Sequence, residues 1–489
     1  MAAVVAGADA GDTVLSRTAA ALARPGAARG PALALSLALL LAALFLPPLA
    51  EGLPVAGQRA LVVTLISIVL WTTEALEPGV TALLGVALLA LTGSGMRGAL
   101  QGFASPVPYF LVGVLTMGVA VVRSGLAERL ARAILERARG RSLAVYLQLV
   151  LAFPALTFVL PSATTRSGIL IHIYDEVFTL AAVPRGAEVA KAVMLALASI
   201  NRLASTALLT GGITPVMSAA IIAANVDGRP ISWTGWFLLM GVPYYTILLL
   251  GGVLTWALYR RGFARDLPAT APVARRPLGG AEWRTVAILL GASALWLTDA
   301  WHHLDPALPA LLAFAALLAP GVGPLRWGDL ERGVGWANFF VIAASISLAQ
   351  ALSTSGAAAW LGRRLVGSLP ALGASAPGTI VLLMLGATAL RAIVPNISGF
   401  LALALPIAMS VGRETGLSPV VCALAVMITG DAVIYYPAQS ASALVIYERG
   451  HVSAGEMLRF GLWMTLVGWI AVLAVALPWW SLVGLPLRP

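Results

Sequence analysis

The sequence predicts an all-α polytopic membrane protein with about 11 transmembrane spans. Of the 489 residues, 60% are hydrophobic and 11% are charged. A soluble domain carries roughly 25% charged residues, so this chain cannot cover a water-exposed surface. Its apolar residues fall into long blocks, and about 20 apolar residues cross the hydrocarbon core as a helix. The short alternating segments of a membrane β-barrel are absent from the sequence.

The formal net charge of +10 comes almost wholly from arginine, since Lys191 is the only lysine. The arginines lie between the apolar blocks, where positive charge reports orientation in the membrane. This placement argues against nucleic-acid binding. Cys422 is the only cysteine, which excludes an internal disulfide and a cysteine metal cluster. We expect it to be a packed core thiol.

The apolar blocks give the order of the spans. Residues 1–30 are expected to be a disordered cytosolic N-terminus, followed by a first span and outer loop at 31–58. The first block is too long for the apolar part of a secretory signal, and more spans follow, so we expect it to be retained. Further spans are expected at about 59–76, 79–93, 106–123, 232–259, 285–300, 307–320, 335–353 and 459–485, with denser apolar regions at 143–224 and 376–446.

Two basic segments set the expected orientation. The segment from Arg123 to Arg141 places leucines on one helical face and arginines elsewhere, which predicts an amphipathic helix at the membrane surface. Residues 263–284 form a basic, proline-containing cytosolic loop. Placing both in the cytoplasm with the N-terminus leaves the C-terminus outside. Each dense region must then contain a helical hairpin that enters and leaves on the same side.

The chain repeats itself. The segment "FLVGVLTMGVAVVRSGLAERLAR" from Phe110 matches "VIAASISLAQALSTSGAAAWLGR" from Val341. At nearly the same offset, "LPSATTRSGILIHI" from Leu160 matches "VPNISGFLALALPI" from Val394. Two matches in register indicate duplication, and hairpins that enter from opposite sides make the repeats inverted. The expected ranges are repeat 1 at 59–262, with a hairpin at about 143–180 and a broken helix at about 190–224, and repeat 2 at 285–489, with a hairpin at about 376–412 and a broken helix at about 418–446.

Polar residues gather at the two predicted hairpin tips. Pro161 precedes one group and Pro395 the other. Non-helical backbone at membrane depth lines a cavity or is buried in protein. A helix that begins after such a break directs its free N–H groups and positive dipole end into the cavity. Two such ends predict an anion site, and the alternative is a pair of ordinary proline kinks with hydroxyls bonded back to the helix.

Each repeat also holds a second break, "STALLTGGITPV" from Ser205 and "YYPAQSASAL" from Tyr435. Glycine and proline destabilise a helix, so both segments are expected to be unwound. Unwound carbonyls are the usual Na⁺ ligands in transporters, whereas small-residue packing of helices is the alternative. The predicted substrate-binding residues are Ser162, Thr164, Thr165, Arg166, Thr210, Gly211, Asn396, Ser398, Gln439, Ser440 and Ser442. The predicted coupling-ion residues are Ser162, Gly212, Asn396, Asp431 and Ala438, with no cofactor and no metal beyond a possible Na⁺.

Three segments resemble the divalent anion:sodium symporter family, within the ion transporter superfamily. They are "WTTEALEPGVTALLG" (71–85), "SGLAERLA" (124–131) and "YYPAQSASALVIYERGHVSAGEMLRFGL" (435–462). The resemblance implies a cation-coupled (Na⁺ or H⁺) secondary transporter for a di- or tricarboxylate or sulfate. It also implies an elevator-type mechanism and a homodimer in the bacterial inner membrane. In the family, Ser-Asn-Thr tips contact the Na⁺ and the substrate carboxylates, and here Ser162 and Thr164 fit the first tip and Asn396 and Ser398 the second.

Arg166 and Arg391 are additions to the family pattern. An arginine in the membrane normally faces a cavity or a partner. Arg166 either clamps the anion bidentately or pairs with an acid such as Asp175 or Asp431. Arg202 is a second candidate of the same kind. Asp431 is suited to binding a cation or carrying a proton. His172 is interpreted as a core residue in preference to a proton relay.

Three other functions remain as alternatives. A cation/proton antiporter or an arsenite-type carrier of the same superfamily requires essential membrane acids, for which Asp175, Glu176 and Asp431 are the candidates. An intramembrane enzyme requires a nucleophile–base pair or metal ligands at helical spacing, and the histidines do not supply them. A channel is disfavoured because paired hairpins argue for alternating access.

Overall fold

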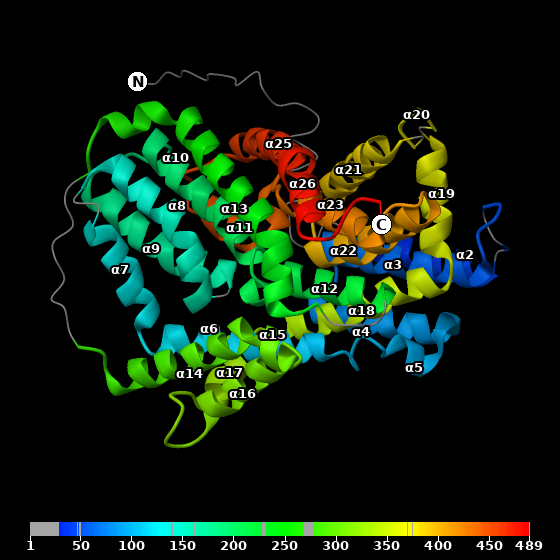
Figure 1. Ribbon diagram of the computed structural model, residues 1–489, viewed down its shortest axis with the longest axis horizontal. Coiled ribbons are helices and arrows are strands. Elements are labelled where there is room, and N and C mark those ends of the chain that lie inside the picture. Colours follow the sequence, from blue (N-terminus) through cyan, green and yellow to red (C-terminus); the bar gives the residue numbers. More distant parts are fainter. Residues whose placement is uncertain are drawn as a thin grey trace, which may run out of the picture.

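The computed structural model describes residues 29–488 except 46, 48, 49, 138, 139, 161, 227–230, 268–276, 369 and 374. Every regular element among them is helical (Figure 1). Within the described residues, eight helices are long and apolar enough to cross a membrane. The predicted N-terminal tail, the tip residue Pro161 and part of the predicted basic loop lie outside the described residues.

The helices of the first half begin with α2 (Arg29–Phe45), α3 (Val55–Thr73), α4 (Pro78–Leu89), α5 (Gly95–Ala99), α6 (Pro106–Arg123) and α7 (Leu126–Arg137). The region predicted to hold a hairpin and a broken helix contains α8 (Ser142–Val159), α9 (Ala163–Leu180), α10 (Glu188–Leu195), the π-helical turn η2 (Ala196–Ile200), α11 (Asn201–Thr206), the 3₁₀ turn η3 (Leu209–Gly211) and α12 (Ile213–Asn225). The long helix α13 (Trp233–Leu258) and the turn η4 (Arg260–Ala264) close this half.

The second half opens with α14 (Gly280–Leu297), α15 (Asp299–His302), α16 (Ala307–Leu318), α17 (Trp327–Gly333), α18 (Ala337–Thr354), α19 (Ala357–Ser368) and α20 (Pro370–Gly373). The second hairpin and broken helix comprise α21 (Ala376–Ile393), α22 (Ile397–Glu414), α23 (Pro419–Asp431), the 3₁₀ turn η5 (Pro437–Gln439) and α24 (Ala441–Tyr447). The chain ends in α25 (Ala454–Ile470), η6 (Ala471–Ala476) and α26 (Leu477–Leu482).

Serine caps start several of these helices. Ser105, Ser375 and Ser418 each accept a hydrogen bond from a backbone N–H two or three residues later, and each is followed within two residues by a proline in the first turn. Proline is favoured in a first turn because its missing N–H has no intrahelical partner there. These serine–proline pairs therefore fix where α6, α21 and α23 begin.

The two repeats are interleaved around their breaks. Within each repeat, the helix before the break packs on its own hairpin: α11 on α8 and α9, and α23 on α21 and α22. The helix after the break packs on the hairpin of the other repeat: α12 on α22, and α24 on α9. In Figure 1 α12 lies beside the orange helix α22, apart from the hairpin α8–α9 at the left. The two polar segments thus meet inside one bundle.

Apolar side chains also cover the outside of the long helices. Leu249, Leu250 and Val253 on α13 and Leu462, Trp463 and Leu466 on α25 are exposed. A soluble protein rarely exposes such a continuous apolar surface to water, whereas a membrane protein exposes it to lipid. The burial pattern therefore agrees with the membrane class that composition predicts.

Candidate functional site

The first hairpin tip is the turn between α8 and α9. Leu160 leaves the helical conformation with φ −124° and ψ 84°. Ser162 has φ −71° and ψ 115°, and its Oγ accepts a hydrogen bond from the Thr165 backbone N–H at 3.2 Å. Ser162 is therefore the N-cap of α9, as a hydroxyl directly after a break favours. Its neighbour Thr164 is exposed at the tip.

The second tip, between α21 and α22, has the same backbone. Val394 leaves α21 with φ −95° and ψ 104°. Asn396 has φ −73° and ψ 119°, and its Oδ1 accepts from the Gly399 backbone N–H at 3.1 Å. Ser398 is buried in the first turn of α22. Ser162 and Asn396, which the sequence repeat pairs, are thus equivalent N-caps.

The first break follows α11. Leu208 is extended, with φ −110° and ψ 138°, before the turn η3. A Cβ added to Gly211 would lie 1.7 Å from the Ser205 carbonyl oxygen, so only glycine fits this close approach. Thr210 is buried, and its Oγ1 accepts from Trp233 Nε1 at 3.3 Å. Gly212 forms the junction with α12.

The second break runs from Ala432 to Ser440 and contains the turn η5. The Gln439 side chain braces it, since Oε1 accepts from the Tyr435 backbone N–H at 2.6 Å and Nε2 donates to the Arg391 carbonyl at 2.8 Å. Ser440 Oγ and Ser442 Oγ lie 2.8 Å apart. Ala438 is exposed on the turn. Both segments that glycine and proline predict to be unwound are therefore unwound.

Arg166 is fully buried and joins the first tip to α11. Its Nε donates to Asn201 Oδ1 at 2.7 Å and its Nη2 to the Asn201 carbonyl at 2.9 Å. Nη2 also donates to Ser205 Oγ, and Nη1 donates to the Leu160 carbonyl, the last of α8 before the tip. The guanidinium therefore satisfies the Leu160 carbonyl, which the end of α8 leaves free, and ties it to α11.

Arg391 does the same at the second tip and is also fully buried. Its Nη1 donates to the carbonyls of Val394 at 2.7 Å and Pro395 at 2.6 Å. Its Nε donates to the Gly430 carbonyl at 3.0 Å, at the end of α23. Each tip is thus tied by one arginine to the broken helix of its own repeat.

Asp431 joins the two breaks. Its carboxylate is 1% exposed and accepts from Arg202 Nη1 at 3.1 Å. It also accepts from the hydroxyls of Thr206 at 2.8 Å and Thr214 at 3.2 Å, which flank the first break, and from Tyr244 at 3.1 Å. Because Gly430 binds Arg391, one continuous polar network runs from the first tip to the second.

This network carries more positive than negative charge. Arg166 and Arg391 are fully buried, and the Arg202 side chain is 12% exposed. Asp431 is the one carboxylate that these contacts include among the described residues. Among these contacts three guanidinium groups meet one carboxylate, and arginine keeps its charge in proteins. Buried positive charge gathered in this way favours a bound anion.

Arg202 presents hydrogen-bond donors to that site. Its Nη1 is used by Asp431, while Nε and Nη2 are buried and have no hydrogen-bond partner among the described residues. These two N–H groups form one edge of the planar guanidinium, the edge that binds a carboxylate or a sulfate side-on with two parallel bonds.

The acids near the surface have other partners. Asp175 Oδ1 accepts from His451 Nε2 at 2.9 Å, and Asp175 Oδ2 accepts from Arg449 at 3.3 Å. His172 Nδ1 lies 3.1 Å from Arg449 Nη2. These contacts hold α9 to the turn after α24. The possible ion-pair partners of Arg166, Asp175 and Asp431, are therefore bound to other cations.

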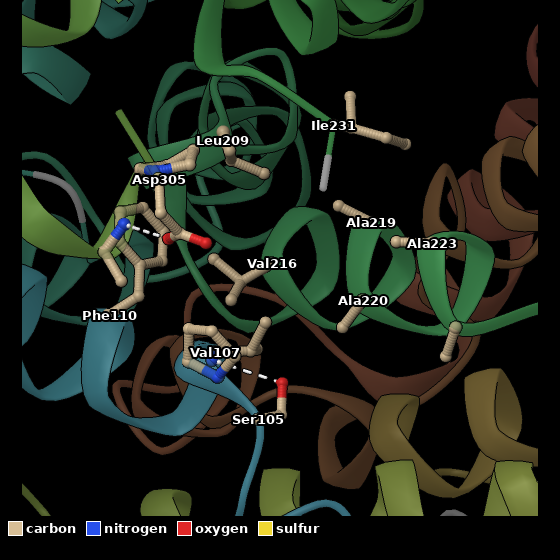
Figure 2. A pocket seen from close by; sticks show the side chains of 14 residues that line it. Ser105, Val107, Phe110, Leu209, Val216, Ala219, Ala220, Ala223, Ile231 and Asp305 are labelled. Carbon is tan, nitrogen blue, oxygen red and sulfur yellow. Dashed lines mark hydrogen bonds between the residues drawn. The ribbon is translucent and has the colours of Figure 1, made fainter. Parts of the chain in front are cut away.

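A separate cavity of about 360 Å³ lies between the start of α6, the helix α12 and the segment before α16 (Figure 2). Figure 2 shows Val107, Phe110, Val216 and Ala220 around it. Its one carboxylate, Asp305, accepts a hydrogen bond from the Ala307 backbone N–H at 2.8 Å. An apolar lining with a negative charge does not suit an anion, so this cavity is not the predicted site.

Five residues outside the predicted site complete the contacts of Arg166 and Asp431: Asn201, Ser205, Thr206, Thr214 and Tyr244. Ser205, Thr206 and Thr214 lie in the segment predicted to be unwound, whereas the sequence pattern singles out neither Asn201 nor Tyr244. Asn201 and Ser205 lie 4 apart on one face of α11, directly beside Arg202. A polar cluster at helical spacing in an otherwise apolar span would have been the signal to follow.

Helices with paired, polar hairpin tips and broken spans in a lipid-facing bundle define a membrane transporter of the two-hairpin type. The model of the family described as "Sodium:sulfate symporter transmembrane region" matches residues 31–485, nearly the whole chain. The chain therefore belongs to the sodium:sulfate symporter family, which agrees with the resemblance to divalent anion:sodium symporters, and it is a transporter, not an enzyme.

Known proteins of similar length resemble it along most of the chain. The "Putative malate transporter YflS" of Bacillus subtilis is 22% identical over 90% of this chain and 93% of its own length. The "Citrate/succinate antiporter" of Escherichia coli strain K12 is 22% identical over 76% of this chain and 80% of its own. The Alcanivorax borkumensis YdaH transporter superposes with a TM-score of 0.55 at 18% identity, covering 87% of this chain and 100% of that one. That likeness shows a shared fold.

Proposed function

We propose that the protein is a secondary transporter that carries a small divalent anion past the two hairpin tips. The observation that carries this proposal is the buried Nε–Nη2 edge of Arg202, with no protein partner among the described residues, inside a network that also holds the buried Arg166 and Arg391. A dianion complements this positive charge, and a carboxylate or sulfate matches the edge geometrically. The N-caps Ser162 and Asn396 mark the tips between which the anion would lie.

Dicarboxylates of the succinate and malate type are our first choice of substrate, with citrate and sulfate next. The printed names of two relatives, a malate transporter and a citrate/succinate antiporter, support carboxylates. The proposed movement is elevator-like, with the two hairpins and two broken helices moving as one body. The interleaved packing of α12 on α22 and α24 on α9 supports such a unit.

The proposed setting is a homodimer in a bacterial inner membrane, with the N-terminus in the cytoplasm and the C-terminus outside. The arginines around α7 and before α14 support this orientation. Cysteine scanning with a membrane-impermeant thiol reagent, on a Cys422→Ala background, tests it. A cysteine near the C-terminus should react from outside in intact cells, and one before α14 should not.

The substrate is tested by uptake into proteoliposomes. Purified protein is reconstituted and offered labelled succinate, malate, citrate and sulfate, each with Na⁺, H⁺ or no gradient, and with or without the same unlabelled anion inside. Arg202→Gln should lower uptake at least tenfold, because it removes the guanidinium edge. Arg332→Gln, on the exposed helix α17, is the matched control. Failure to carry any of the four anions under every condition would refute the proposal.

The second candidate function is cation/proton antiport, which Asp431 would serve. The four contacts of Asp431 to Arg202, Thr206, Thr214 and Tyr244 favour a fixed ion pair over an exchangeable proton site. If Asp431→Asn abolished all transport while variants of the tips stayed active, antiport would be the better assignment.

A further inference from the structure

Arg202 differs from the other two arginines of the network in how it uses its hydrogen-bond donors. Every side-chain nitrogen of Arg166 and of Arg391 donates to a protein oxygen. Arg202 uses Nη1 for Asp431, while its Nε and Nη2 are buried without a hydrogen-bond partner among the described residues. A buried donor without a partner is costly, so an arginine with a purely structural role would use this edge on the protein as well. The unused edge therefore points to a ligand.

The Asp431 carboxylate holds the remaining nitrogen of that guanidinium. Its Oδ1 accepts from Arg202 Nη1 at 3.1 Å and from Thr214 Oγ1 at 3.2 Å. Its Oδ2 accepts from Thr206 Oγ1 at 2.8 Å and from the Tyr244 hydroxyl at 3.1 Å. A carboxylate offers about four acceptor positions, and these four donors occupy them. The carboxylate is therefore fixed in one orientation, and so is the arginine that it binds.

The four donors come from three helices that meet at Asp431, the last residue of α23. Arg202 and Thr206 lie on α11 before the first break, Thr214 lies on α12 after it, and Tyr244 lies on α13. Thr214 and Tyr244 are thus on other helices than Arg202, and their hydroxyls donate to Asp431. Their connection to the arginine runs through the carboxylate.

We infer that Tyr244 and Thr214 are positioning residues of the anion site and that they act through Asp431. They fix the carboxylate, and the carboxylate holds the Nε–Nη2 edge of Arg202 in the orientation in which it binds the anion. This inference rests on the proposed anion transport and adds the residues that set the geometry of its arginine. An edge that is already held in place loses little freedom on binding, so the anion is bound more tightly than by a free side chain.

The first test separates affinity from turnover in proteoliposomes, with whichever of labelled succinate, malate, citrate and sulfate the wild-type protein carries fastest. Tyr244→Phe and Thr214→Val each remove one hydroxyl from the carboxylate and nearly keep the shape of the side chain. We expect each to raise KM about fivefold and to change the maximal rate less than twofold, because the edge of Arg202 is then poorly oriented. Thr214→Ser keeps the hydroxyl and should keep KM within twofold of the wild type. An unchanged KM in either hydroxyl-free variant would overturn the inference.

Thr429→Val is the matched control for this test. Thr429 is buried on α23 two residues before Asp431, and its hydroxyl donates to the Ala425 carbonyl of its own helix at 2.8 Å. The variant loses one buried hydroxyl, as Thr214→Val does, and should keep KM within twofold of the wild type. A fivefold rise here would show that loss of any buried hydroxyl in this region weakens binding, and would overturn the inference.

The second test asks whether the effect of Tyr244 passes through Arg202. The apparent Kd of the anion is taken from the rise in melting temperature with anion concentration, which requires no turnover. In an Arg202→Gln background there is no guanidinium edge to orient, so adding Tyr244→Phe should change this Kd less than twofold. A further fivefold loss of affinity in that background would show that Tyr244 acts by another route, and would overturn the inference while leaving anion transport intact. A wild-type protein that carries none of the four anions would instead refute the proposed function, and the inference with it.

Discussion

The first and second tips place the same charge by different means. Arg166 lies after its tip on the outgoing arm, and its contacts include the carbonyls of Leu160 and Asn201 and the side chains of Asn201 and Ser205. Arg391 lies before its tip on the incoming arm and binds three backbone carbonyls at 3.0 Å or less. The N-caps of the two tips match in sequence position and backbone angles, whereas the arginines lie on opposite sides of their tips in the sequence.

That difference separates two kinds of constraint. A backbone turn is specified locally, so duplication preserves its residues in register. A buried charge needs only to reach a given point, and a long side chain reaches it from either arm of a hairpin. The comparison therefore predicts that the second tip, held by backbone acceptors alone, is the more sensitive of the two.

The largest effect is expected on removing the arginines. Arg391→Met leaves three buried carbonyls without their donor, and we expect a loss of about 4 kcal/mol, within the range for breaking a buried charged network. Arg166→Met should cost about 3 kcal/mol, because Asn201 and Ser205 can rotate toward other partners whereas carbonyls cannot. Unfolding in mixed detergent micelles gives both values.

Arg363→Met is the matched surface control and should cost below about 1 kcal/mol, as exposed ion pairs do. Equal costs for the two buried arginines, or a larger cost at Arg166, would show that the two tips are not held in the different ways that their hydrogen bonds indicate.

The next effect compares the glycines beside the breaks. In Gly211→Ala the new methyl would lie 1.7 Å from the Ser205 carbonyl oxygen, and the backbone of α11 cannot move away as a side chain can. In Gly430→Ala it would meet the ring of buried Phe400 at 2.2 Å, which can shift in part. We expect losses of about 3 kcal/mol and about 2 kcal/mol, in the range of overpacked cores. Thermal unfolding measures both.

Gly118→Ala in α6 is the control for this pair, since nothing lies within 4 Å of its added methyl and alanine favours a helix. It should be neutral or stabilising. A neutral Gly211→Ala would mean that the first break does not approach α11 as closely as described.

The sequence predicts the fold because its signals are local. Proline after an apolar block, followed by Ser162 or Asn396, sets a helix end and a helix start within three residues. Gly211 and Gly212, after Thr210, mark the first unwound segment in the same way, and Pro437 marks the second. Helix positions follow, because one apolar block is one helix in a membrane.

The contacts of the site are less predictable because they join distant parts of the chain. Arg166 was open between a substrate clamp and a pair with Asp175 or Asp431, and it binds Asn201, 35 residues away. Asp431 meets Arg202 across 229 residues. Which acid pairs with which arginine depends on how the repeats interleave, and that arrangement has no local signal.

A smaller effect concerns the charge of the site. Asp431→Asn removes one negative charge from the network around Arg202, so a trivalent anion should gain over a divalent one. We expect the ratio of citrate to succinate uptake at pH 7.5 to rise about tenfold, equivalent to about 1.4 kcal/mol.

Thr206→Val is the control for this change, because it removes one hydrogen bond to the same carboxylate and no charge. Its ratio should stay at the wild-type value. If Asp431→Asn left the ratio unchanged, the anion would not be selected by the charge of this network.

The smallest effect is expected where an ion pair lies outside the membrane, in contrast to the buried arginines. At the start of α17, the Arg326 backbone N–H donates to Asp329 at 3.0 Å, and Arg123 donates to the same carboxylate. The Arg326 hydrogen bond first, and Arg123 second, hold the pKa of Asp329 below its usual value. A lowered carboxyl pKa stabilises the folded state at a pH above the pKa of the unfolded state, about 3.9. This stabilisation is lost as the pH falls through the pKa of the folded state.

Asp329→Asn should therefore lower the melting temperature by about 1 °C at pH 7 and not at pH 3, since exposed pairs contribute little. Arg123→Gln should lower it less, because the backbone donor remains. A larger drop for Arg123→Gln than for Asp329→Asn would mean that the ion pair, not the backbone hydrogen bond, stabilises the charge.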